Sequence, residues 1–507
     1  MKTIGAGAIL VLGMAAVGGC VHAQTLVPET QHMTIRVGRP LITLGPAATL
    51  PDTPYSSISL TTGGYRGFLS GGGDVYRVEG ADPWSVGGAQ TLMLTGQSST
   101  YGSCGLWMNG EKLNVGSSYF GIVHAETSCD YANNGQTHKS MALATSGDQG
   151  ATWSLVGQII TGSEPPTTGM PTGEGDCTWV NDTDYLYAYC LNTVDYGLFV
   201  ARAPISSPIP GQWLKYFSGA WSEPGLGGQS STLKYVNVDG SVTDLHLGSG
   251  SVSTSANFGL TMLLNNDSVQ GSRSGITIAF SSDHLSFTKL AQPILVTDGQ
   301  EWVRNSSSHD LVAYPSAISY GGGNQWPDRF LLTYMYVAPG EPFTRRYLVF
   351  RDVSIQLNNQ AYDGSQAQVG VELSRWVNTA SSPQEIWTTT APVPGNYSTF
   401  SYKGGLGYVL TGPLTGGNAA TTVELEECTS MWPGNIDHLI TLDGTCITAG
   451  YKRLRTIGWI YATNLPNSVP LYRCWSQNLY RSHFISNQAD CEELGTMEFL
   501  LGYAAAM

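Results

Sequence analysis

Charged side chains are scarce in this sequence, and cationic ones are the scarcer kind. Only 12% of the 507 residues are charged, roughly half the usual share. The 24 Lys and Arg residues are outnumbered by 38 Asp and Glu residues, so the net charge is −14 and the isoelectric point is near 5.0. No basic run occurs, which argues against a nucleic acid or an anionic membrane as the partner. The shortage of Lys and Glu also argues against long exposed helices.

Long apolar runs are missing once the first 23 residues are set aside. Those residues contain Lys2, an apolar stretch over 4–17 and the small-residue site Val21-His22-Ala23, a pattern typical of a secretory signal peptide cleaved after Ala23. No later stretch approaches the roughly 18 apolar residues of a membrane span, so we expect a soluble, secreted, monomeric protein. Lipid attachment at Cys20 is the less favoured alternative.

Closely spaced metal ligands are also missing, because no CxxC or His-x-x-x-His occurs, so structural zinc is not indicated. No other cofactor is indicated, although a bound calcium ion stays open. Cleavage after Ala23 leaves eight cysteines, an even number suited to an oxidising compartment. The sequence alone does not fix their pairing, but we predict bridges between nearest neighbours, each stabilising by roughly 3 kcal/mol. The predicted bridges are Cys104–Cys129, Cys177–Cys190, Cys428–Cys446 and Cys474–Cys491.

Glycine and aromatic residues are abundant instead, with 62 Gly, 26 Tyr and 13 Trp, and they favour β-structure. From Cys104 onward a unit of roughly 55–80 residues recurs, with a Gly-rich turn, an aromatic-rich second strand, a third strand ending in small residues and a Trp-bearing fourth strand. Such four-stranded units are blades of a β-propeller. We predict an all-β fold with a five-bladed β-propeller over residues 30–422, six blades being the alternative. The segment 60–96 supplies a further blade, and strands near 32–45 or 366–412 close the ring.

The last 85 residues contain two shorter repeats of a different kind. Residues 423–428 align with 469–474, His438 aligns with His483, and Gly458 aligns with Gly502. We predict a separable, disulfide-stapled accessory module over residues 423–507, and we expect a chain that ends at Thr421 to keep its propeller. The pair resembles a small secreted repeat of unknown function that is appended to bacterial exported enzymes.

Acidic residues gather where the strand order places one rim of the propeller. Starts of first strands and second-to-third hairpin loops share that rim, and two carboxyl groups flanking a sugar ring can supply an acid and a base. We expect one carboxyl to keep its proton towards neutral pH while its partner stays ionised. A structural role in a turn or an ion pair is the alternative for each acid. The catalytic candidates are Glu126, Asp176 and Asp82, and the substrate-binding candidates are His124, Glu174, Arg345 and Arg346.

One turn and several short motifs carry a family resemblance. Residues 146–153, Ser-Gly-Asp-Gln-Gly-Ala-Thr-Trp, fit the Asp-box of sialidase-like propellers, and residues 281–287 are a degenerate copy. Together with Asp82-Pro-Trp84, His124-Ala-Glu126 and Gly173–Cys177, they resemble secreted, glycoside-hydrolase-like propellers of the sialidase-like superfamily. The resemblance implies that the Asp-box turns are structural and lie on the face opposite the catalytic one. Sialidases carry an Arg-Ile-Pro signature that Thr34-Ile35-Arg36 does not match, which argues against sialic acid as the substrate.

Three functions remain open at this point. The first is a secreted glycoside hydrolase that acts on a neutral or acidic polysaccharide through rim carboxylates. The second is a non-catalytic carbohydrate-binding or adhesion propeller. The third is a polysaccharide lyase that uses His124 or a tyrosine as its base and Arg345 to neutralise a uronate. Reducing-sugar release separates a hydrolase from a binding protein, and the ultraviolet absorbance of an unsaturated uronate reveals a lyase.

Overall fold

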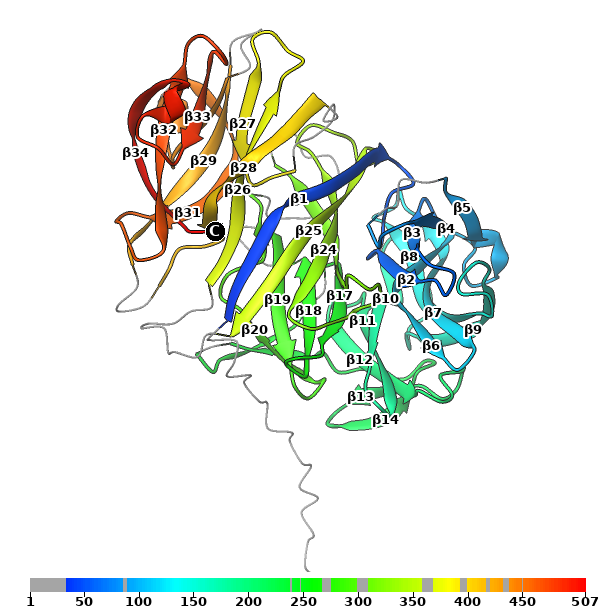
Figure 1. Ribbon diagram of the computed structural model, residues 1–507. Helices are drawn as coiled ribbons and strands as arrows, with labels where there is room; N and C mark the ends of the chain where they lie inside the picture. Colours follow the sequence, from blue (N-terminus) through cyan, green and yellow to red (C-terminus); the bar gives the residue numbers. More distant parts are fainter. Residues whose placement is uncertain are drawn as a thin grey trace, which may run out of the picture.

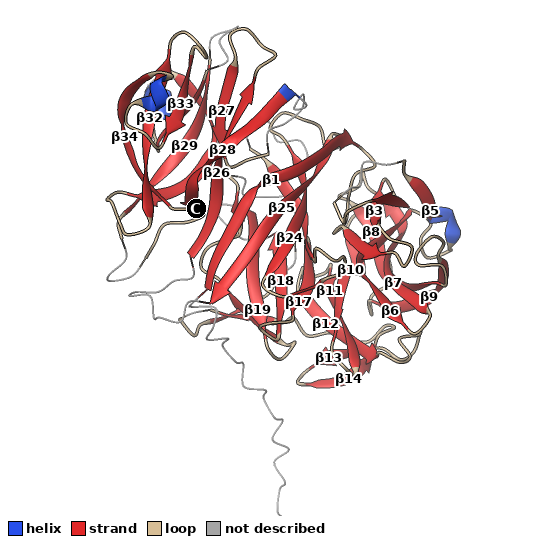
Figure 2. Cartoon of the chain, viewed as in Figure 1, coloured by secondary structure: helices blue, strands red, loops and turns tan. Residues whose placement is uncertain are grey.

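A computed structural model describes residues 33–507 apart from 85–88, 238, 247, 267–274, 299–308, 358–367, 393–398, 416–419, 432–436 and 449. The expected signal peptide and Cys20 lie outside the described residues. The described chain is almost entirely β-strand (Figures 1 and 2), and its helical turns are as short as η2 (Gly96–Ser98), α1 (Thr445–Thr448) and η4 (Cys491–Glu493). The all-β prediction is confirmed. None of the described helices has the length and apolar character needed to cross a membrane.

Five antiparallel units of four strands follow one another through the described residues before position 358. The first unit contains β2 (Ser56–Ser59), β3 (Tyr65–Gly71), β4 (Asp74–Gly80) and β5 (Thr91–Thr95). The second contains β6 (Gly105–Val115), β7 (Ser118–Asp130), β8 (Gln136–Ser146) and β9 (Ser154–Thr161), and the third β10 (Pro171–Asn181), β11 (Tyr185–Asn192), β12 (Leu198–Pro204) and β13 (Leu214–Phe217). The fourth contains β17 (Gly250–Ser255), β18 (Leu260–Asn266), β19 (Gly275–Ser281) and β20 (Ser286–Lys289). The fifth contains β22 (Leu311–Ile318), β24 (Arg329–Val337), β25 (Arg346–Leu357) and β1 (Met33–Ala47). Short strands extend two of the units: β14 (Ala220–Pro224) extends the third, and the fourth is extended by β15 (Lys234–Val236), β16 (Val242–Asp244), β21 (Leu295–Val296) and β23 (Gln325–Trp326).

These units form a closed ring. The N-terminal strand β1 pairs antiparallel with β25, from Met33 opposite Leu357 to Ala47 opposite Arg346, and so completes the fifth unit. The first strands β2, β6, β10, β17 and β22 contact one another in chain order, and β22 in turn contacts β2. Of the two predicted ways to close the ring, the structure therefore uses the strand near residues 32–45.

A separate apolar core fills each of the five junctions between neighbouring units. Phe68 and Trp153 pack edge to face between the first and second units, with ring centroids 5.9 Å apart. Between the fifth and first units, Tyr55 packs against Phe350 in the same way. Burial of large aromatic side chains at every junction stabilises the ring as a whole.

Two acidic turns sit between third and fourth strands, at the end of the ring away from the starts of the first strands. Asp148 accepts hydrogen bonds from the Ser146 hydroxyl at 2.8 Å and from the backbone N–H and hydroxyl of Thr152 at 2.9 and 2.6 Å. Asp283 accepts the corresponding bonds from Ser281 and Ser286. Each carboxylate thus organises its own turn, which is a structural role.

The four predicted disulfides are present. Cys104–Cys129 connects the start of β6 to the end of β7, and Cys177–Cys190 connects β10 to β11. Four disulfides are typical of a protein that folds in an oxidising compartment, as expected for secretion.

The C-terminal region contains three repeats, so the prediction of two repeats needs correction. Each repeat is a long strand that pairs with a short strand and with a second long strand: β26 (Gln368–Asn378), β27 (Glu385–Thr389) and β28 (Phe400–Leu410); β29 (Thr422–Ser430), β30 (His438–Leu442) and β31 (Tyr451–Tyr461); β32 (Ser468–Ser476), β33 (Ser482–Ser486) and β34 (Thr496–Ala505). The first repeat lacks the disulfide. Trp376 lies opposite Trp387 in it, at the register where Cys428 and Cys474 stand in the other two.

One buried core spans the predicted boundary at residues 422/423. Leu373 and Leu406 of the first repeat share one buried core with Leu425 of the second and Leu471 of the third. A division after residue 422 would cut through that core, and β26 also pairs in parallel with β1 of the ring. Figure 1 shows the three repeats, coloured yellow to red, beside the ring at β1.

The three repeats meet where their last strands approach one another closely. β28, β31 and β34 pair with one another in a cycle, and each has a glycine at the crossing. A Cβ on Gly458 would lie 2.6 Å from the Leu410 carbonyl oxygen, one on Gly407 2.9 Å from that of Ala505, and one on Gly502 2.7 Å from that of Tyr461. Only glycine permits this approach.

We expect Gly458→Ala to lower the free energy of unfolding by about 3 kcal/mol, because a methyl group would overlap a backbone oxygen at a φ of +144°. Gly404→Ala is the matched control, because Gly404 has a φ of +137° but no atom within 4 Å of the added Cβ. That variant is expected to lose only about 1 kcal/mol. Urea unfolding measures both, and equal losses would contradict the close approach.

Candidate active site

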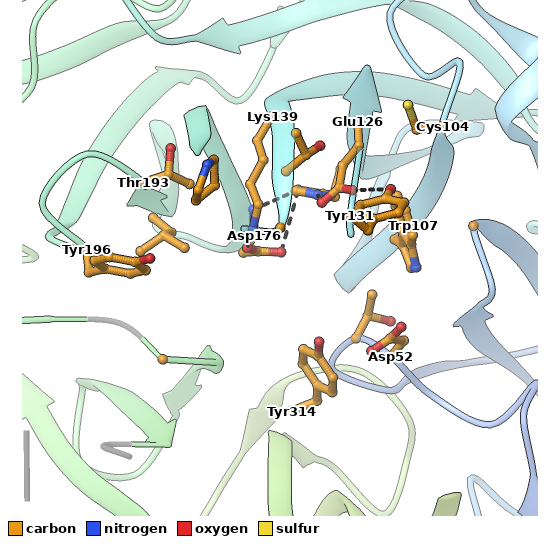
Figure 3. A pocket seen from close by; sticks show the side chains of 18 of the residues that line it. Asp52, Cys104, Trp107, Glu126, Tyr131, Lys139, Asp176, Thr193, Tyr196 and Tyr314 are labelled. Carbon is orange, nitrogen blue, oxygen red and sulfur yellow. Dashed lines mark hydrogen bonds and ion pairs between the residues drawn. The ribbon is translucent and has the colours of Figure 1, made fainter. Parts of the chain in front are cut away.

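A cavity of about 830 Å³ opens at the end of the ring where first strands begin and second strands end. Its wall combines carboxylates, one ammonium group and several aromatic rings, as sites that bind polar ligands commonly do. The charged lining residues are Asp52, Glu126, Lys139 and Asp176, and the aromatic ones are Trp107, His124, Tyr131, Tyr196 and Tyr314. Figure 3 shows Glu126, Lys139 and Asp176 on one wall, with Asp52 and Tyr314 across the opening.

A hydrogen-bonded chain organises the first wall around His124. The Nδ1 atom of this buried imidazole accepts the backbone N–H of Asp176 at 3.0 Å. The proton of the neutral ring therefore resides on Nε2, which donates to Glu126 Oε1 at 3.1 Å. Tyr131 donates its hydroxyl proton to the other oxygen of Glu126 at 2.6 Å, and Lys139 donates to Asp176 Oδ2 at 2.7 Å.

Backbone irregularities aim two residues from opposite sides of the ring into the cavity. Asp176 has a φ of +52°, and the register between β10 and β11 shifts at that point. Tyr314 also has a φ of +52°, at a register shift between β22 and β24. Bulges of this kind redirect side chains next to functional sites, and non-glycine residues hold such a φ only where the surroundings impose it.

Both carboxylates of the first wall are ionised near neutral pH. Burial raises the pKa of Glu126, but the hydrogen bond from His124, the polarity of the adjacent His124 ring, the charge of Lys139 and the hydrogen bond from Tyr131 outweigh burial and lower the pKa to about 2. Burial likewise raises the pKa of Asp176, but the charge of Lys139, the polar His124 ring and the hydrogen bond from Lys139 lower it to about 2. The prediction that one of this pair keeps its proton towards neutral pH is therefore wrong.

This ionisation predicts an acid-sensitive stability. The pKa of Glu126 falls from an ordinary 4.5, and that of Asp176 from 3.8, to about 2 on folding. The unfolded chain therefore binds more protons in that range, and the free energy of unfolding decreases as the pH falls from about 4.5 to about 2. Asp176→Asn and Glu126→Gln each remove one such group, so each is expected to flatten that slope. Urea midpoints between about pH 2 and pH 7 measure the slope, and an unchanged slope in both variants would contradict the assignment.

The other predicted site residues lie away from the cavity wall. Asp82 follows β4 and is not among the described lining residues. Glu174 is buried against Lys215 at 2.5 Å, and burial raises its pKa to about 7. Arg345 pairs with Glu341 at 2.5 Å near the surface, whereas Arg346 is buried, donates to the carbonyl oxygen of Leu50 at 3.0 Å and lies 3.8 Å from Asp52. Of the seven candidates, the structure brings His124, Glu126 and Asp176 together.

Sequence reasoning missed Asp52 and Lys139. Asp52 precedes the first unit, and its backbone N–H donates to the Ser70 carbonyl oxygen at 2.7 Å. Within the described residues its Oδ1 atom is buried without a hydrogen-bond partner. Lys139 lies near the start of β8, in the segment Thr137-His-Lys-Ser140, and is the cross-strand partner of Glu126 in the β7–β8 hairpin. That hairpin pairing was the signal by which the sequence could have placed Lys139 beside Glu126.

A possible metal cluster proves to be a disulfide. Glu426, Cys428 and Cys446 place ligand atoms within 4.8 Å of one another in the described part of the chain. The two sulfurs are bonded to each other, and a disulfide offers no thiolate to a metal ion.

Comparisons with known proteins give only distant likenesses. No protein-family model matches the sequence, and no curated protein matches it. Among solved structures, the chain is similar to a family 117 glycoside hydrolase of Zobellia galactanivorans, with a TM-score of 0.41, 10% identity and coverage of 65% of this chain and 92% of that one. It is also similar to the catalytic domain of a Coprinopsis cinerea GH62 α-L-arabinofuranosidase, with a TM-score of 0.39, 13% identity and coverage of 64% and 98%. A GH43_1 enzyme from Xanthomonas citri, complexed with xylotriose, gives a TM-score of 0.38, 12% identity and coverage of 65% and 91%. Likenesses this weak assign neither a substrate nor a mechanism.

Proposed function

We propose that this protein is a secreted glycoside hydrolase, that its ring is a five-bladed β-propeller, and that the cavity beside His124 is its active site. The observation that supports this function best is the position of carboxyl groups on two facing walls of one cavity (Figure 3). Glycosidases need two carboxyl groups on either side of the scissile bond, one to donate a proton and one to act as base or nucleophile. Aromatic rings beside them provide surfaces on which sugars can stack.

The ionised group in this proposal is Asp176. Its side chain is 29% exposed, whereas that of Glu126 is 11% exposed and has both oxygens engaged by His124 and Tyr131. Asp176 therefore meets the substrate and accepts a proton from the attacking water. As the water oxygen bonds to the anomeric carbon, the glycosidic C–O bond breaks, and Asp52 on the facing wall gives its proton to the leaving oxygen.

The lyase alternative loses two of the groups assigned to it. His124 is buried, its Nδ1 accepts a backbone N–H, and its Nε2 carries a proton towards Glu126, so neither nitrogen is free to act as a base. Arg345 pairs with Glu341 and is not among the described lining residues, so it does not neutralise a uronate in the cavity. A lyase in this cavity would have to use a tyrosine as its base, and a binding protein would use the same cavity without turnover.

Hydrolysis in heavy-oxygen water separates the three functions. A hydrolase transfers the heavy oxygen to the new reducing end, a lyase releases an unsaturated product without it, and a binding protein releases nothing. We expect the wild-type protein to label the reducing ends of at least one polysaccharide in a broad panel. Unsaturated products, or binding with no release from a broad polysaccharide panel, would contradict the proposal.

We further propose that residues 368–507 form an accessory unit of three repeats that packs on the propeller. This division is supported by the shared core of the repeats and by polar contacts across the junction, where Arg453 meets Asp298 and Arg455 meets Asp310, each at 2.5 Å.

A further inference from the structure

The lining of the cavity is negatively charged overall. Asp52, Glu126 and Asp176 contribute three carboxyl groups, and Lys139 is the single Lys or Arg among the described lining residues. With Asp52 holding the proton that the proposed hydrolysis requires, Glu126, Asp176 and Lys139 give the lining a formal charge of −1. The pKa values of about 2 for Glu126 and Asp176 keep two of these charges in place at neutral pH.

The cations near the cavity are already engaged. Burial lowers the pKa of Lys139, but the charges of Asp176 and Glu126 have the larger effect and raise its pKa overall. This ammonium group is therefore charged, and it donates to Asp176. Arg346 is buried and lies 3.8 Å from Asp52, and its guanidinium donates to the carbonyl oxygens of Ala48 and Leu50. Lys215 lies fully buried against Glu174. None of these cations presents a free donor to an incoming anion in the described structure.

The field of the whole protein has the same sign. The chain carries a net charge of −14, and its sequence contains no run of basic residues. A polyanion would therefore meet repulsion on approach as well as in the cavity.

From these observations we infer that the cavity accepts an uncharged glycan and rejects uronate, sialate and sulfated sugars. This inference rests on the proposed function of the same site and narrows its substrate class. A carboxylate or sulfate on the sugar bound beside Asp176 would add a like charge to a wall whose own charges are only partly compensated. Hydroxyl groups, by contrast, can donate hydrogen bonds to these carboxylates.

Matched polymers test the inference. Galactan, mannan and β-glucan are used in native form and after oxidation of their C6 hydroxyl groups to carboxylates, and affinity electrophoresis and reducing-sugar release are both measured. We expect the native form of the preferred polymer to bind and react about 100-fold better than its oxidised form. The difference between the native and the oxidised polymer should become smaller as the salt concentration rises from about 0.01 M to about 1 M, because ions screen the repulsion.

Charge variants locate the effect. Asp176→Asn removes a negative charge from the cavity and is expected to reduce the difference in binding between native and oxidised polymers. Asp239→Asn removes one from an exposed turn and should leave that difference unchanged. An oxidised polymer that binds or reacts as well as its native form would overturn the inference and leave the proposed hydrolysis intact. Native polymers that bind selectively but are never cleaved would overturn the hydrolysis and support the inference. If no polymer binds in either form, both are overturned.

Discussion

Asp176→Asn is expected to reduce turnover by about 100-fold or more while the protein stays folded, since loss of a general base has an effect of this size. Asn is nearly isosteric with Asp, and it tolerates the left-handed φ of +52° at this position. Its amide can no longer take a proton from water. Lys139 loses one partner but keeps the charge of Glu126 nearby.

The control for this variant is Asp148→Asn. Asp148 organises a turn through Ser146 and Thr152 at the other end of the ring, and those hydrogen bonds lower its pKa to about 2. We expect the control to lower the melting temperature and to leave turnover unchanged. Full activity in Asp176→Asn on a polymer that the wild-type protein cleaves would show that the base lies elsewhere.

Truncation of the C-terminal region is expected to have the second large effect, a loss of cooperative folding that depends on where the chain ends. A chain that ends at Thr421 keeps the first repeat but loses the partners of Leu373, Leu406 and Val409 in the shared core. Exposure of each large apolar side chain removes about 1.5–3 kcal/mol of stabilisation. We therefore expect this chain to aggregate or to melt without cooperativity, contrary to the prediction from sequence.

A chain that ends at Leu357 is the matched comparison. It keeps β1 paired with β25, so the ring stays closed, and it removes all three repeats together. Val369 and Val371 leave the core between the fourth and fifth units, and Asp298 and Asp310 become open to water. Calorimetry should show a single cooperative transition for this chain at a modestly lower temperature. A cooperative, native-like melt of the Thr421 chain would contradict the shared core.

Local signals in the sequence account for what could be predicted. Pairing of nearest neighbours predicted the four disulfides correctly, because each bridge closes a short local segment of 13 to 25 residues. His124 and Glu126 could be placed near Asp176, because the end of one second strand and the next first strand share a rim. The first of the three repeats escaped detection because it lacks the disulfide, and Trp376 stands where the other two repeats have Cys428 and Cys474.

Long-range packing accounts for most of what could not be predicted. Glu174 and Asp176 are two residues apart, and a regular strand would direct them to the same face. The bulge at Asp176 separates them, so Glu174 meets Lys215 while Asp176 enters the cavity. Asp52 reaches the cavity only because the chain folds back over β3 and is held there by Ser70 and Arg346. The ionised state of Glu126 and Asp176 depends on Lys139 and on hydrogen bonds that appear only in the folded ring.

The most direct test of the account is a crystal structure of the Asp176→Asn variant soaked with the neutral oligosaccharide that the wild-type protein binds best. The account predicts a sugar ring in the cavity, between the wall that carries residue 176 and the wall that carries Asp52, with its glycosidic oxygen towards Asp52. An oligosaccharide bound on the C-terminal repeats, with the cavity empty, would contradict it.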